Sequence, residues 1–379
     1  MAHKVYLDNN ATTKVDEKVV HEMLPFLTER YGNASSMHEF GKEADQAIDD
    51  AREIVAHALG GSQREIFFTS GGTEADNLAI IGYCLANRDK GDQIITQRTE
   101  HSAVLNAFEH LRSLGFDVVV LDVDREGHID QGRLEDAMND GTLLVSIMAA
   151  NNEIGTLHDI RSIAGAVHAH GAALHTDAVQ AITKLPLGRS DDFDLLSMAA
   201  HKFHGPKGVG ALFIRKGLKV QPIMFGGGHE RGLRPSTENV PGIVGMGAAM
   251  RIGISTMDAD VERMARLRER MVYAITETIP GVEVNGPRHH RLCNNANLLF
   301  PETDGQQLVL RLDKAGFAVS TGSACSTHHV GASHVLTAIG LTPRQAGGSL
   351  RISLSRFTTA SEVDGLVAAL PECVKASRL

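Results

Sequence analysis

Short apolar runs alternate with stretches of helical periodicity through the first two thirds of the chain. The alternation predicts an α/β domain built around a mainly parallel, seven-stranded sheet. A short Gly/Pro turn joins the last two runs, which argues against a parallel crossover between them. Two of the helical stretches are Ala103–Leu114 and Ile160–His170. The seven runs that predict strands are Glu65–Thr69, Gln93–Thr96, Asp117–Asp122, Leu143–Met148, Ala172–Thr176, Asp194–Met198 and Val209–Ile214.

The pattern changes after Pro235. Ile243–Ile254 is apolar and rich in glycine, and Asp258–Thr278 then has the periodicity of one long, charged amphipathic helix. We expect this stretch to lead into a smaller α+β domain. The segments of that domain include Asn295–Phe300, Gln306–Ala315 and Leu350–Ser355.

Composition narrows the classes of function. Of 379 residues, 42% are hydrophobic and 22% are charged, which suits a sizeable core. With 37 basic and 46 acidic residues the formal charge is −9, so a general nucleic-acid partner is not expected. Apolar runs fall short of a bilayer span and the N-terminus lacks a secretion signal, so no membrane is expected either. Four scattered cysteines do not form a disulfide framework, and a cytoplasmic location is expected.

A candidate anion site follows the first predicted strand, where Ser-Gly-Gly-Thr leads into a helix. Gly71 and Gly72 allow the backbone to approach a ligand, and the free N–H groups and the Thr73 hydroxyl suit an anion. A plain strand–helix turn with a Thr cap explains the pattern equally well. The segment matches neither GxxxxGK[ST] nor GxGxxG, so nucleoside triphosphates and dinucleotides are not favoured.

Two polar residues follow later strands. Asp177 lies at a strand end, where α/β proteins bind ligands, although Asp is also a favoured helix N-cap. Lys202 follows another apolar strand and is expected to be partly desolvated, which lowers the pKa of an amine and suits a Schiff base. A solvated lysine is the plainer alternative, and Lys207 is expected to be more exposed. The anion site, the carboxylate and the amine together meet the requirements of pyridoxal 5′-phosphate (PLP).

Two more side chains suit that chemistry. His101 follows a strand and could lie over the cofactor ring and carry protons, or it could be a surface or cap histidine. Cys325 lies among small polar residues, which suits a mobile nucleophilic thiol, whereas most free cysteines are buried and inert. Cys84, in an apolar helical pattern, is expected in the core.

Together these segments resemble the cysteine desulfurases of the NifS/IscS type, PLP enzymes of the aspartate-aminotransferase fold (fold type I). The resemblance implies a large domain at residues 15–257 and a small domain at residues 1–14 and 258–379 that carries the Cys325 loop. It runs from Tyr6–Thr13 to Arg351–Thr359. Between these lie Tyr31–Ser36, Ser70–Glu74, Glu100–His101, Ala150–Gly155, Asp177–Gln180, His201–Lys202, Gly226–Gly232 and Gly322–Cys325.

The resemblance also implies roles for individual residues. Lys202 would bind the PLP aldehyde and remove the Cα proton of L-cysteine, and Cys325 would take the sulfur as a persulfide, leaving L-alanine. A homodimer and a sulfur-acceptor protein, such as an iron–sulfur scaffold, are the implied partners. His101 would stack on the ring, Asp177 would pair with its nitrogen and Gln180 with its 3-oxygen. The phosphate would be held by Gly72, Thr73, His201 and the second subunit's Thr237, and the substrate carboxylate by Asn152 and Arg351.

Two departures and three alternatives accompany this interpretation. Ala199 stands where the family often has Ser, which removes one phosphate donor, and Pro235-Ser236 replaces the usual Ser-Gly before Thr237. A PLP aminotransferase of the same fold would need Lys202 and Asp177 but not Cys325, and a selenocysteine lyase is a narrower variant. A metal-binding scaffold protein is an alternative of another class, suggested by 19 histidines and by Cys325, His328, His329 and His334.

Overall fold

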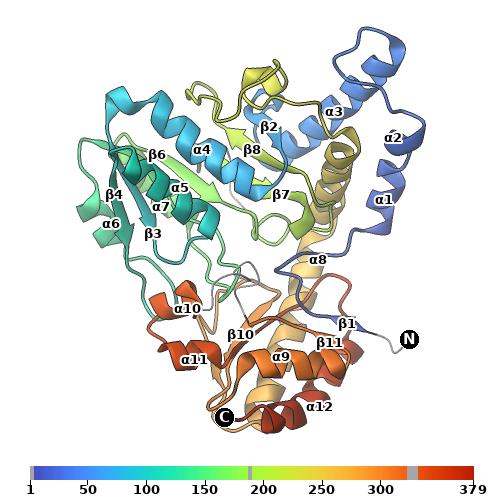
Figure 1. Cartoon of the computed structure of the whole chain (residues 1–379), viewed down its shortest axis with the longest axis vertical. Helices are drawn as coiled ribbons and strands as arrows, with labels where there is room; N and C mark the ends of the chain where they lie inside the picture. The colour runs from blue at the N-terminus through green and yellow to red at the C-terminus, as the bar shows by residue number, and fades with distance from the viewer. Residues whose placement is uncertain (1–3, 187–189, 322–331) are drawn as a thin grey trace.

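A seven-stranded sheet forms the centre of the computed structural model, which describes residues 4–186, 190–321 and 332–379 (Figure 1). The strand order is β2-β8-β7-β6-β5-β3-β4. β8 is antiparallel to β2 and β7, and the other neighbours are parallel. The predicted sheet is confirmed, with each strand end within two residues of its predicted position. The strands are β2 (Ile66–Thr69), β3 (Gln93–Gln97), β4 (Asp117–Leu121), β5 (Thr142–Ser146), β6 (Ala173–Asp177), β7 (Leu195–Ala199) and β8 (Gly210–Ile214).

Helices cover both faces of this sheet. One apolar cluster joins one face to α3 (Glu39–Ala58), α6 (Gln131–Ala137) and α7 (Ile160–Ala169), and a second joins the other face to α4 (Gly72–Ala86) and α5 (Ser102–Ser113). Because both faces are covered, the central strands are buried throughout, which explains their continuous apolar sequences. The remaining short elements of this part are α1 (Glu17–Met23), α2 (Pro25–Thr28) and the 3₁₀ turns η1 (Gln63–Glu65), η2 (Arg88–Lys90), η3 (Ala200–Lys202) and η4 (Glu230–Gly232).

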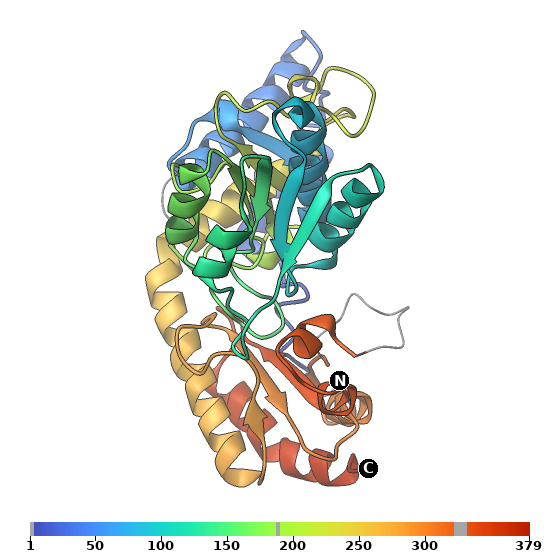
Figure 2. The same ribbon diagram turned by 90° about the vertical axis from the view of Figure 1, so that its left-hand side faces the viewer.

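One helix, α8 (Val240–Thr278), spans 39 residues and runs along one side of the molecule (Figure 2). The helix predicted over Asp258–Thr278 is confirmed, but it begins earlier than predicted, at Val240, and includes the glycine-rich stretch. Glycine is needed at two positions of this helix because neighbouring segments pack closely against it. A Cβ at Gly245 would lie 2.6 Å from Met23 Sδ, and one at Gly247 would lie 3.0 Å from Ala51 of α3. By length and composition α8 is apolar enough to cross a bilayer, but 56% of that apolar window is buried inside the protein, as in a core helix.

The lower part of the molecule holds a third apolar cluster, to which α8 contributes Met271 and Ile275. A three-stranded antiparallel sheet of order β12-β10-β9 lies here, and β1 pairs with β11 in parallel. The domain division at residue 258 stays a prediction, since α8 continues unbroken across it. The elements are β1 (Val5–Tyr6), β9 (Glu283–Val284), β10 (Asn295–Leu299), α9 (Gly305–Lys314), β11 (Phe317–Ala318), α10 (His334–Ala338), α11 (Pro343–Gly347), β12 (Ser349–Ser353) and α12 (Ala360–Ala376).

Candidate active site

Asp177 and Lys202 meet at one edge of the large sheet. Asp177 ends β6, and Lys202 follows the neighbouring parallel strand β7 through η3. The Lys202 ammonium donates to the backbone oxygens of Asn10 (2.7 Å) and Ala11 (2.9 Å). The carboxyl ends of parallel strands are the usual ligand edge of an α/β sheet, so the two residues stand where a cofactor would bind.

The Asp177 carboxyl is buried and accepts a hydrogen bond from the backbone N–H of Val179 at 2.9 Å. Burial raises its pKa, and the nearby positive charges of His101 and Lys202 oppose that rise. A protonated ring nitrogen placed against Asp177 would supply a further positive charge and favour the ionised carboxylate. The environment therefore fits the predicted partner of a pyridine nitrogen.

His101 caps the start of α5, where its Nδ1 accepts the backbone N–H of Ala103 at 3.1 Å. In the neutral ring the proton therefore sits on Nε2. Glu100, beside it, is fully buried, and burial raises its carboxyl pKa to about 8. Glu100 accepts hydrogen bonds from the Met148 backbone and the Gln97 side chain. A largely protonated acid thus lies directly before His101 in the chain.

The candidate phosphate site lies at the N-terminus of α4, a helix of 15 residues that begins at Gly72. The space beside Gly71 is open, because a Cβ added to this glycine would have no atom within 4 Å. The side chain of Thr73 is exposed. Glu74 accepts hydrogen bonds from the Ser70 backbone N–H and hydroxyl, and from Arg234 at 2.7 Å. Because Arg234 pairs with this carboxylate, its negative charge is compensated beside the predicted anion site.

His201 is half-buried, and its Nδ1 lies 3.1 Å from the Thr12 hydroxyl. Burial, reinforced by the charges of Lys202, Lys207 and Lys184, lowers its pKa to about 4. A phosphate held by His201 would therefore meet a neutral imidazole rather than a cation. Lys207, as expected, is exposed.

The substrate end of the site is contributed by both parts of the molecule. Arg351 on β12 is 1% exposed, and it bonds Asp8 at 2.8 Å and the backbone oxygen of Asn152 at 3.3 Å. The structure therefore brings Asn152 and Arg351 together, as the prediction requires. The ion pair with Asp8 was not anticipated from the sequence.

Asn10 contacts several of the predicted site residues, and the sequence analysis did not single it out. Its backbone oxygen accepts from Lys202 and, at 2.9 Å, from the side-chain amide of Gln180. Its own amide donates to the Asn152 backbone and accepts from Asn294. The motif Tyr6–Thr13 was part of the resemblance, and its paired asparagines were the available signal. Gln180 keeps its buried Oε1 without a hydrogen-bond partner, which fits a cofactor hydroxyl as donor.

Three predicted features stand apart from this cluster. Thr237 is exposed in the segment before α8, and Ser236 beside it has φ +96°, where the family pattern has Gly. Cys325 lies outside the described residues, as do His328 and His329. On either side of residues 322–331, Ser320 pairs with Arg351, and His334 Nε2 lies 2.9 Å from the Glu100 backbone oxygen. Within the described ranges, no group of three or more His, Cys, Asp or Glu side chains could hold a metal ion.

Cys84 of α4 lies in the apolar core of the protein, as predicted, and burial raises the pKa of its thiol. Cys293 is also buried, and Cys373 is half-buried. These environments keep the thiols protonated and so disfavour nucleophilic chemistry at each of them.

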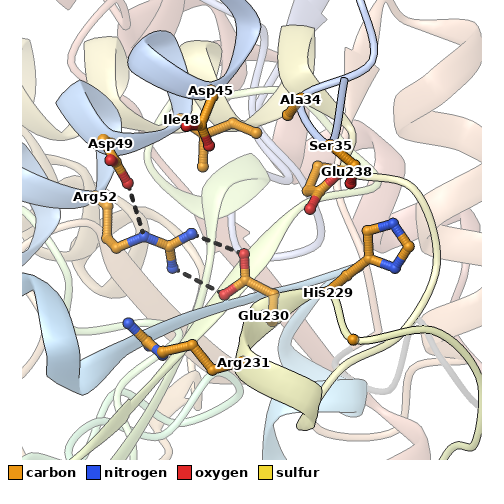
Figure 3. A pocket seen from close by; sticks show the side chains of 11 residues that line it. Ala34, Ser35, Asp45, Ile48, Asp49, Arg52, His229, Glu230, Arg231 and Glu238 are labelled. Atoms are coloured by element: carbon orange, nitrogen blue, oxygen red, sulfur yellow. Dashed lines mark hydrogen bonds and ion pairs between the residues drawn. The ribbon is translucent and has the colours of Figure 1, made fainter. Parts of the chain in front are cut away.

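A cavity of about 550 Å³ lies elsewhere, between the middle of α3 and the segment 228–238 (Figure 3). Arg52 and Glu230 form a buried ion pair on its wall, with N–O distances of 2.8 Å. Ala34 and Ser35 line it from the loop before α3. Residues of the predicted catalytic set do not line this cavity.

The chain matches the family model described as Aminotransferase class-V over residues 5–366. It is 46% identical to a cysteine desulfurase IscS of Dictyoglomus turgidum, over 96% of this chain and 93% of that protein. It is also 46% identical to a cysteine desulfurase IscS of Methanosarcina thermophila, over 99% of this chain and 93% of that protein. The solved structure of a NifS-like protein covers 98% of this chain and 100% of its own, at 40% identity and a TM-score of 0.93, which confirms the fold. The chain belongs to the class-V aminotransferase family and, within it, to the cysteine desulfurases of the NifS/IscS type.

Proposed function

We propose that this enzyme removes sulfur from L-cysteine with the help of PLP and releases L-alanine. The observation that carries the proposal is the meeting of Lys202 and Asp177 at the ends of neighbouring parallel strands, with His101 close enough to act on the Asp177 charge. The names of the relatives support the same substrate. We place the reaction in the cytoplasm, where a reactive thiol stays reduced.

The residues present fit PLP. Asp177 would partner the ring nitrogen, Gln180 the ring oxygen, and Lys202 the aldehyde, while Gly72 and Thr73 at the start of α4 would hold the phosphate with His201. When bound, PLP supplies an aldehyde that links to an amine and a ring that withdraws electrons from the bonds around the substrate Cα. The orphaned Gln180 Oε1 and the open space beside Gly71 are the structural features that such a molecule would use.

Each side chain then has a task. The Lys202 amine, released from its carbonyl partners, takes the proton from the substrate Cα, and His101 Nε2 holds a proton over the site. Arg351 and Asn152 orient the substrate carboxylate, for which the planar guanidinium is suited. The charge of Asp8 beside Arg351 keeps that guanidinium fixed until substrate arrives.

We propose Cys325 as the sulfur acceptor. Its thiolate attacks the substrate sulfur, the bond between Cβ and sulfur breaks, and the carbon product takes up protons to become alanine. In sum, L-cysteine and the Cys325 thiol give L-alanine and a Cys325 persulfide, so atoms and electrons balance without an external oxidant. An acceptor protein such as an iron–sulfur scaffold would then receive the sulfur.

Intact mass spectrometry after incubation with L-cysteine tests this proposal. We expect one added sulfur atom on the peptide that contains Cys325, with alanine in solution. Cys325→Ser should keep the absorbance of bound PLP and lose the adduct, whereas Cys373→Ser, the matched control, should keep both. Normal sulfide release by Cys325→Ser would overturn the role of Cys325. Efficient amino transfer to 2-oxo acids without alanine or sulfide would indicate an aminotransferase, and a preference for selenocysteine would indicate a lyase.

We also propose that the enzyme is a homodimer. Large apolar side chains are exposed on the loop before α3 and on the segment before η4, among them Met37 (92%) and Phe225 (87%). Both segments line the cavity of Figure 3, at Ala34 and Ser35 and at Gly228, so they lie side by side. Exposed apolar area of this kind is typical of an interface.

Sedimentation analysis of Phe225→Asp tests the homodimer. We expect this variant to shift toward the monomer, because a charge would be buried in the interface. Tyr273→Asp places the same charge on an exposed residue of α8 (67%) and is the matched control. A dimer unaffected by Phe225→Asp would assign the interface to another surface.

A further inference from the structure

Lys184 is a second lysine beside the site, and none of the roles above uses it. It follows Gln180 in the turn after β6, and it is 7% exposed. Lysines are almost never buried to this degree unless their ammonium groups have partners. Its position directly behind two predicted site residues makes those partners informative.

The Lys184 ammonium donates to two backbone oxygens, those of Gln180 at 3.0 Å and Lys202 at 3.2 Å. These oxygens belong to different segments, one following β6 and the other following β7. A single buried cation therefore ties the segment of Asp177 and Gln180 to the segment of Lys202. The tie fixes the relative positions of the groups that would hold the two ends of the cofactor ring.

Lys184 lines a small cavity together with several other charged or titratable side chains. They are Lys202 of η3 and the nearby His204, Asp260 of α8, and Arg356 of the segment after β12. Asp260 is bonded to Thr256 at 2.7 Å, Arg356 to Asp16 at 2.5 Å, and His204 to the Lys14 backbone at 2.9 Å. Cys293 is a further titratable neighbour. These groups have hydrogen-bond partners of their own, and Lys202 is a further positive charge that acts on Lys184.

Burial lowers the pKa of Lys184 to about 8, and the positive charge of Lys202 lowers it further. At neutral pH Lys184 is still mostly protonated. The repulsion between two ammonium groups is mutual, so the Lys184 charge disfavours the charged form of the Lys202 nitrogen. An adjacent cation is one of the general ways to activate a lysine for bonding to a carbonyl.

We propose that Lys184 is a positioning residue for Lys202: its ammonium fixes the backbone at Gln180 and Lys202 and places a second positive charge beside the segment that carries Lys202. The inference rests on the proposed function, because it assigns Lys184 to the lysine that would bind PLP.

Spectrophotometric pH titration of the PLP-loaded enzyme tests this role through the absorbance of the lysine-linked cofactor. Lys184→Met removes both charge and donor, Lys184→Gln keeps a neutral donor, and Lys184→Arg keeps a charge. Lys207→Met removes an exposed lysine from the same region and is the matched control. We expect the titration midpoint to rise by on the order of one pH unit in the Met and Gln variants. It should stay near the wild-type value in Lys184→Arg and Lys207→Met.

Wild-type midpoints in both Lys184→Met and Lys184→Gln would overturn the proposal and leave Lys184 a structural tie only. An equal rise in Lys184→Gln and Lys184→Arg would also overturn it, because charge would not be the cause. If Lys184→Met does not fold, the comparison of the Gln and Arg variants still decides. Failure of wild-type protein to show any lysine-linked cofactor band would contradict the proposed function itself, which separates the two failures.

Discussion

Two regions of this protein bury charged side chains, and they stabilise those charges differently. On the wall of the cavity in Figure 3, Arg52 and Glu230 meet through two hydrogen bonds of 2.8 Å, so each charge is compensated by the other. At the strand ends, Lys184 and Lys202 donate to backbone oxygens, and burial raises the pKa of Asp177. The first arrangement holds the fold together. The second keeps protons where they can be exchanged, at a cost in stability.

The largest effect is expected at Lys202. Lys202→Ala removes both the amine that would bind PLP and the base that would take the substrate proton, so activity should fall by at least about 10³-fold. The free energy of unfolding should change little, because the lost hydrogen bonds are to backbone oxygens beside the site. Alanine production and urea unfolding measure the two quantities. Activity within tenfold of wild type would contradict the assignment.

At the cavity wall we expect a large effect on the free energy of unfolding when the partner of Arg52 is removed. Glu230→Ala leaves the buried Arg52 guanidinium with only the more distant Asp49 carboxylate, at 3.8 Å, and the Phe68 backbone N–H without its acceptor. Breaking a buried pair in this way should lower the free energy of unfolding by about 3 to 5 kcal/mol. Urea unfolding followed by circular dichroism gives the value, and Glu230→Gln should lose less because its amide oxygen can still accept from Arg52 and from the Phe68 N–H. A loss below about 1 kcal/mol would remove the contrast between the two regions.

A moderate, pH-dependent effect is expected at Glu100. Its carboxyl has a pKa of about 8 in the folded protein against an ordinary value of 4.5. Between these values the folded chain holds a proton that the unfolded chain releases, so Glu100 makes stability fall as pH rises through this window. Glu100→Gln removes that contribution and should gain relative to wild type on going from pH 5 to pH 8. Parallel stabilities for the two proteins at both pH values would show that Glu100 is ionised when folded.

The smallest effect is expected for an ion pair at the surface. Arg270 of α8 and Asp364 of α12 meet at 2.6 and 2.7 Å, but both side chains are more than half exposed. Water and salt screen such pairs, so Arg270→Met should change the free energy of unfolding by less than about 1 kcal/mol. A larger loss, measured by the same urea titration, would indicate that geometry rather than burial decides the worth of a pair.

The sheet was predictable because its strands are continuous apolar runs, a pattern that depends only on local sequence. The start of α8 at Val240 could not be predicted in the same way, because glycines are unfavourable in an isolated helix. They are explained by the close approach of Met23 and Ala51, which come from other segments. Asp177 and Lys202 could be found from their positions after strands. Each depends on one local feature, the end of a strand, that the sequence displays directly.

The contacts of Asn10 and Lys184 could not be predicted from the sequence for a common reason, although the Tyr6–Thr13 motif marked the segment of Asn10. Their importance lies in which backbone oxygens and amides they meet, and those partners come from segments far away in the chain. A lysine is by default a surface residue, so nothing in its local sequence indicates that Lys184 is buried. The roles of Thr237 and Cys325 depend on a second subunit and on residues outside the described ranges, and they stay predictions.

The contacts of Asn10 also bear on how the enzyme is made. Its backbone N–H donates to the Ser353 hydroxyl at 2.9 Å, while its oxygen receives the Lys202 ammonium. Ser353 is synthesised 343 residues after Asn10. The pocket around Lys202 therefore cannot close before Ser353 has left the ribosome, which places capture of the vitamin after that point of translation.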